Sequence, residues 1–128
     1  MASAMSDPWV LFNRKLEEFA VDLCTTYAEV KEFHVLKNSV RLAAMMTPKL
    51  PQTIFHQHVF IPYEQHIINK NEVFFLEEDY ASHLEGNSVN LDIVQQIKGI
   101  WKSLAPDQKE IIWKYMQVLV VLNRRCIA

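Results

Sequence analysis

The chain has 128 residues, of which 50% are hydrophobic and 22% are charged, with a formal net charge of −2 at pH 7. This balance is typical of a globular protein, and the length suits one domain that can bury a hydrophobic core without disulfides or metals. Gly86 and Gly99 are the only glycines, which argues against a β-sandwich or barrel and against a glycine-rich phosphate-binding loop.

The first residues predict a short segment followed by a helix. Residues 1–6 lack the basic start and apolar run of a secretory signal peptide, and we expect a leader or disordered segment there. Residues 7–128 are predicted to form a single helical domain. Asp7-Pro8 is a helix-start signal, because the aspartate can accept from a free first-turn amide and proline fits the first helical position. Apolar residues at helical spacing then continue to about Tyr27.

The same spacing from Val30 to Met46 predicts a second helix. No glycine or proline separates it from the first one. The sequence therefore allows either a new helix capped by Thr25 or Thr26, or one helix that continues through a kink. We favour two helices.

Prolines divide the next part of the chain. Pro48 and Pro51 predict a break, because the residue before a proline is driven out of the helical region, and Pro51 can open a third helix. Pro62 should lie at a bend or at the start of a helix that runs to about Lys70, since proline donates no amide inside a helix. For residues Asn71–Tyr80 we favour a short helix over an extended segment, with Asn71 as its cap.

The last third of the chain predicts two amphipathic helices, Leu91–Leu104 and Pro106–Cys126. Trp113 and Leu119 should be largely buried. The apolar face of the final helix is widened by Ile111, Val118, Val120 and Val121. A helix this apolar is typical of a core position. We therefore expect an all-α fold, a compact bundle of five or six helices with the apolar C-terminal helix near its centre.

Charge is distributed unevenly along the chain. Acidic residues prevail in residues 51–92 and basic residues from 93 onward. We favour the interpretation that these two regions complement each other inside the fold. The alternative is a basic face that binds nucleic acid or an acidic partner. The candidate interaction residues are Glu72, Glu77, Glu78, Asp79, Lys98, Lys102, Lys109 and Lys114.

Motifs for catalysis or metal binding are missing from the sequence. His56 and His58 are two positions apart and would point to different sides of a helix, and no HExxH or CxxC pattern occurs. The two cysteines, Cys24 and Cys126, lie in no catalytic signature; we expect free thiols, although a bridge between them is compatible with the sequence. We predict that the protein is not an enzyme and uses no metal, cofactor or small-molecule substrate. No apolar run is long enough to cross a membrane.

Several short patterns between Phe55 and Leu122 resemble one group of proteins. The patterns are Ile61-Pro62-Tyr63-Glu64, Phe74-Phe75-Leu76, Ile100-Trp101-Lys102 and Ile112-Trp113-Lys114-Tyr115. They resemble short uncharacterised helical proteins encoded by large DNA viruses of algae and protists. The resemblance implies a viral origin, a helical fold and a location in the cytoplasm or nucleus of the host cell, or in the virion, rather than secretion. It implies no activity and no site residue.

Together, these observations predict a non-enzymatic helical module that acts through a protein partner or self-association, as a viral structural or assembly protein. The alternative is a nucleic-acid-binding accessory protein that uses the basic C-terminal helices. An exposed apolar patch would favour the first function, and one exposed stripe of lysines would favour the second.

Overall fold

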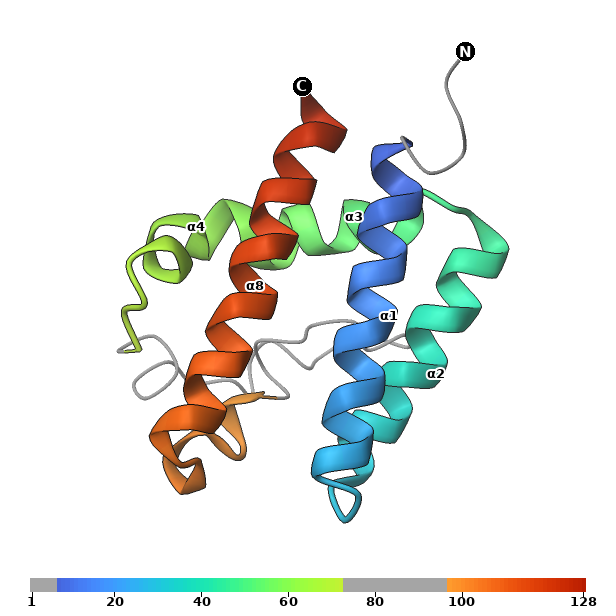
Figure 1. Ribbon diagram of the computed structural model, residues 1–128. Helices are drawn as coiled ribbons and strands as arrows, with labels where there is room; N and C mark the ends of the chain where they lie inside the picture. Colours follow the sequence, from blue (N-terminus) through green and yellow to red (C-terminus); the bar gives the residue numbers. More distant parts are fainter. Residues whose placement is uncertain (1–6, 73–96) are drawn as a thin grey trace.

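The computed structural model describes residues 7–72 and 97–128, and it is all-helical, with no β-strand among these residues. This confirms the predicted fold class. The α-helices are α1 (Pro8–Thr26), α2 (Lys31–Met46), α3 (Leu50–Phe55), α4 (Ile61–Ile68) and α8 (Pro106–Ile127), shown in Figure 1. A π-helical turn, η2 (His56–Phe60), joins α3 to α4, and a 3₁₀ turn, η3 (Trp101–Ser103), precedes α8. No helix in the described part is long and apolar enough to cross a membrane.

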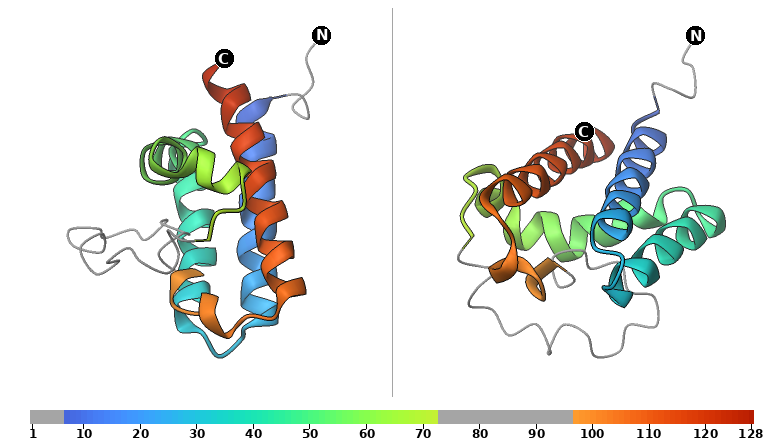
Figure 2. Two further views of the ribbon diagram at one scale, coloured as in Figure 1. Left: turned by 90° about the vertical axis from the view of Figure 1, so that its left-hand side faces the viewer. Right: turned by 60° about the horizontal axis from the view of Figure 1, so that its bottom comes forward.

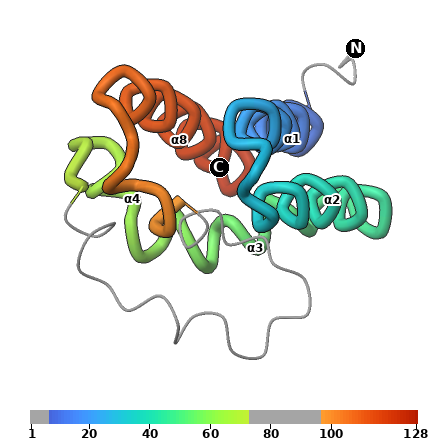
Figure 3. Tube along the Cα trace, turned by 90° about the horizontal axis from the view of Figure 1, so that it is seen from below, coloured from blue at the N-terminus to red at the C-terminus, as the bar shows by residue number. Residues whose placement is uncertain are grey.

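The helices form two layers. α1 and α8 lie side by side in one layer, and α2 and the continuous α3–η2–α4 segment form the other (Figures 2 and 3). α1 contacts both α2 and α8, while α8 also contacts α4 and η2. The hydrophobic core fills the space between the layers, with Phe12, Leu36, Val59 and Met116 fully buried.

α8 has one buried side and one exposed side. Trp113 and Leu119 are buried, as predicted. Ile111, Val118 and Val121, however, are 54%, 41% and 49% exposed. With about 100° of rotation per residue, these three residues lie on the side of the helix opposite to Met116. The expectation that they widen the core face is therefore wrong, and the expected central position of α8 is not confirmed.

The start of α1 and the break before α2 follow from local contacts. The Asp7 side chain accepts from the amides of Trp9 and Val10 at 2.9 and 3.4 Å, which confirms the predicted cap. α1 and α2 are separate helices, also as predicted. Thr25 and Thr26 do not cap α2, because they lie in the last turn of α1, and the N-cap position of α2 is Val30 with no side-chain cap.

Pro62 is the second residue of α4, which confirms its predicted place at a helix start. The chain does not break there, because η2 contains a wider turn in which the amide of Ile61 donates to the carbonyl of His56, five residues earlier. Such π-helical turns relieve local conflicts in a continuous helix. The turn thus lets the chain pass from α3 to α4 without leaving the helical region of backbone conformation, despite the proline.

The predicted helix ending at Leu104 is wrong in its last part. The chain turns at Gly99–Ile100, forms η3 and is extended at Leu104. Glycine is a weak helix former, and the turn buries Trp101 against Trp113, with ring centroids 5.3 Å apart. The rest of that helix, from Leu91 to residue 96, and all but the first two residues of the helix predicted at Asn71–Tyr80 lie outside the described residues. The number of five or six helices therefore stays a prediction.

A chain of polar side chains crosses the junction of α1, α3, η2 and α8. Nε1 of Trp9 donates to Oε1 of Gln52 at 3.1 Å, and Nε2 of Gln52 donates to Oδ1 of Asn123 at 2.9 Å. The Asn123 amide then donates to Nδ1 of His56 at 3.1 Å. Gln52 and Asn123 are buried, so these bonds replace the hydrogen bonds that both amides would make with water.

Candidate protein-interaction surface

Two of the predicted interaction residues, Glu72 and Lys109, contact each other. Nζ of Lys109 lies 3.3 Å from Oε2 of Glu72, and Nε1 of Trp101 donates to the same oxygen at 2.8 Å. The ammonium group also lies 5.2 Å from the ring centroid of Trp101. This cluster joins the segment after α4 to the start of α8.

Among the described residues, Lys102 and Lys114 do not join this pair. Glu77, Glu78 and Asp79 lie outside the described residues. Lys98 is half-buried, Lys102 is exposed on η3, and Lys114 is exposed on α8. Because Lys109 turns inward to Glu72, the four lysines do not form the single exposed stripe that a phosphate-binding surface would need.

Opposite charges also join α4 to α8. Nε and Nη2 of Arg124 donate to Oε2 of Glu64 at 2.8 and 2.6 Å, and Lys70 pairs with Glu110. Nε2 of Gln117 donates to the carbonyls of Ile67 and Ile68 at the end of α4, at 3.2 Å each. Exposed ion pairs stabilise a fold only weakly. The Glu64–Arg124 pair nonetheless supports the interpretation that the acidic middle and the basic tail complement each other inside the fold, whereas Lys70–Glu110 has the opposite polarity.

The Glu72 cluster gives a prediction for acid stability. The hydrogen bonds from Trp101 and from Lys109 lower the pKa of Glu72 below its usual 4.5. The group therefore stabilises the fold above pH 4.5, and this contribution is lost as the pH falls through the lower pKa of the folded state. We expect the free energy of unfolding of the wild type to decrease more steeply below pH 4.5 than that of Glu72→Gln, as measured by urea denaturation. Parallel pH profiles would contradict the assigned role of this carboxylate.

Exposed apolar side chains also lie on the outer side of α8. We call it the α8 outer face and define it as Ile111, Lys114, Val118, Val121 and Arg125. Lys114 lies one turn before Val118, and Arg125 lies one turn after Val121. Neither cation has an ion-pair partner among the described residues, in contrast to Lys109 and Arg124 on the same helix. Val118 and Val121 are thus flanked by an unpaired positive charge on each side, and Ile111 lies one turn before Lys114.

Two open grooves run beside this face. One, of about 550 Å³, is lined by Lys114, Gln117, Val118, Val121, Leu122 and Arg125. The other, of about 220 Å³, extends toward α1 and is lined by Lys15, Glu18, Ile111, Lys114, Tyr115 and Val118. Both include Lys114 and Val118. Small ligands usually bind in clefts that enclose most of their surface, whereas open grooves along a helix suit a peptide or another helix.

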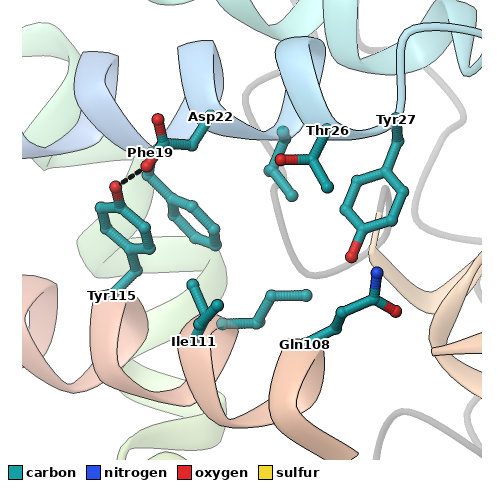
Figure 4. Close-up of a pocket in the computed structure, with 9 residues that line it drawn as sticks. Phe19, Asp22, Thr26, Tyr27, Gln108, Ile111 and Tyr115 are labelled. Atoms are coloured by element: carbon teal, nitrogen blue, oxygen red, sulfur yellow. Dashed lines mark hydrogen bonds between the residues drawn. The ribbon is translucent and has the colours of Figure 1, made fainter. Parts of the chain in front are cut away.

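A smaller pocket lies between α1 and α8 (Figure 4). The hydroxyl of Tyr115 donates to Oδ2 of Asp22, and its ring stacks on Phe19 with centroids 4.5 Å apart. Burial and the Asp22 carboxylate raise the pKa of Tyr115, so the phenol remains a protonated donor at neutral pH. The volume of about 50 Å³ accommodates water-sized groups and is far below that of typical ligand sites. We interpret this contact as a link between the two helices.

Sequence reasoning did not select most of the α8 outer face. The apolar spacing places Ile111, Val118 and Val121 on the core face, and Arg125 is not among the predicted interaction residues. The position of each residue around the helix axis could have shown this. Ile111, Val118 and Val121 lie on the side opposite to Met116, and one neighbouring layer cannot bury both sides of a helix.

No group of three or more histidine, cysteine, aspartate or glutamate side chains in residues 7–72 and 97–128 is placed to hold a metal ion. Both cysteines are buried free thiols. No protein-family model, curated protein or solved structure matches the chain.

Proposed function

We propose that the protein is a non-enzymatic helical module that binds a protein partner on the α8 outer face. The observation that carries this proposal is the row of Ile111, Val118 and Val121, each 41–54% exposed, beside two open grooves. Covering these side chains removes apolar surface from water, which stabilises a complex by about 25 cal/mol per Å² before the costs of association. Exposed apolar side chains beside open grooves are typical of interaction sites.

The alternative, a nucleic-acid-binding accessory protein, would use the unpaired cations Lys102, Lys114 and Arg125. Two observations favour the protein partner. Lys109 and Arg124 are already neutralised by Glu72 and Glu64, and valines, which offer no stacking surface for bases, lie between the two cations of α8. A role in virion assembly is an additional proposal that depends on the sequence resemblance alone.

The α8 outer face can be tested with two matched valines. Val121 on α8 and Val35 on α2 are 49% and 51% exposed, so a glutamate should be tolerated equally at both sites. We expect Val121→Glu to weaken partner binding at least tenfold, because it places an unpaired charge in the apolar contact. Val35→Glu should bind like the wild type, and both variants should melt within a few degrees of it.

The measurement is site-specific crosslinking in the cells that make the protein. A photoreactive residue at position 118 should give a discrete protein adduct that disappears with Val121→Glu and persists with Val35→Glu. Equal loss with both variants, or an adduct insensitive to both, would contradict the proposed surface. Salt-sensitive binding of unrelated oligonucleotides by the purified chain, abolished by Lys114→Glu, would instead support the nucleic-acid function.

A further inference from the structure

Lys114 and Arg125, the two cations of the α8 outer face, favour a partner that has negative charge. Arg125 is eleven positions after Lys114, which corresponds to about 16 Å along the helix. Val118 and Val121 lie between them, each one turn from the nearer cation. The described cations elsewhere on the α4–α8 contact are paired with carboxylates, so Lys114 and Arg125 are the positive charges of α8 that remain for a partner.

From this arrangement, and on the basis of the proposed function, we infer that the occupant is an amphipathic helix of another protein with acidic residues at both ends of its apolar stripe. The five residues of the α8 outer face follow one another at three- and four-residue spacing, and a row of this kind is the pattern that a second helix matches in groove-type recognition. Acidic residues about three turns apart on the partner would reach Lys114 and Arg125 together. The grooves on either side of Val118 would receive its apolar side chains.

A second copy of this chain fits the same face less well. In an antiparallel pairing centred on Val118, Lys114 of one copy would lie within one turn of Arg125 of the other, and the same contact would recur by symmetry. In a parallel pairing, Lys114 would face Lys114. Both arrangements bring like charges together at an apolar contact, which opposes association. An acidic partner removes this repulsion.

The test is a selection from displayed helices of about twenty residues against the full chain. Each helix has a fixed leucine stripe, and the positions flanking the stripe vary among glutamate, glutamine and lysine. We expect glutamate to be enriched. The best acidic peptide should bind Lys114→Glu/Arg125→Glu about three- to tenfold more weakly than the wild type, mostly because its association rate falls. The peptide with lysine in place of glutamate should bind this variant more tightly than it binds the wild type. Arg14→Glu/Lys31→Glu, which changes net charge equally on other helices, should leave affinity within about twofold.

The outcomes of this experiment distinguish an error in the inferred partner from an error in the proposed binding surface. Peptides that need Val121 but show no acidic preference would overturn the acidic partner and leave the α8 surface in place. Peptides that bind equally to Val121→Glu would overturn the surface itself. An equal loss with both double variants, or no enrichment of any helix, would overturn the inferred acidic helix. A dimer in analytical ultracentrifugation that dissociates with Val121→Glu would identify a second copy as the occupant and also overturn it.

Discussion

Replacing Trp101 with alanine should lower the free energy of unfolding by about 3–5 kcal/mol, the usual cost of removing a large buried aromatic side chain. Trp101 is fully buried and packs edge-on against Trp113, with an interplanar angle of 75°. Its indole donates to Glu72, and Lys109 lies over its ring. One side chain thus joins η3, α8 and the segment after α4, and its loss leaves a cavity at their junction.

The matched control is Trp101→Phe, which keeps an aromatic ring in the cavity and removes the hydrogen bond to Glu72. We expect it to cost less than alanine, because the ring retains much of the packing. Urea denaturation measures both variants, and near-ultraviolet circular dichroism reports the loss of the Trp101–Trp113 contact. Equal destabilisation by alanine and phenylalanine would show that the hydrogen bond, rather than burial, dominates at this position.

Trp101 also shows where sequence reasoning about the fold succeeded and failed. Helix starts are local, so Asp7 and Pro62 predicted two of them correctly. The turn at Gly99 is different: the apolar spacing from Ile97 to Leu104 fits a helix, but the chain leaves the helix so that Trp101 can reach Trp113 and Glu72. Those contacts depend on residues far away in the sequence, which spacing alone does not reveal.

The candidate site was predictable only in part for the same reason. The distribution of charge indicated that acidic and basic regions meet, and Glu72 with Lys109 is one such contact. Sequence alone did not distinguish Lys109, which turns inward, from Lys114, which remains unpaired on the α8 outer face. It also did not show which side of α8 its neighbours cover, because that depends on how α1 and α4 pack against it.

Replacing Asn123, at the centre of the buried polar chain, should also lower the free energy of unfolding strongly. Asn123→Leu removes the acceptor for Gln52 and the donor for His56 while keeping a side chain of similar shape. Each buried polar group left without a partner costs about 1–3 kcal/mol. We expect the free energy of unfolding to fall by about 2–4 kcal/mol in urea denaturation, since the buried Gln52 amide has no route to water and His56 is only half-buried.

The double variant Gln52→Leu/Asn123→Leu decides whether this cost comes from unpaired polar groups. It removes both buried amides, and the remaining partners, Trp9 and His56, are only half-buried and can bond to water. We therefore expect the double variant to be more stable than Asn123→Leu alone, because replacing both members of a buried hydrogen bond with apolar groups is nearly neutral. If the two substitutions instead add, the penalty reflects lost packing at the junction of α1, α3 and α8, and the polar chain contributes little to stability.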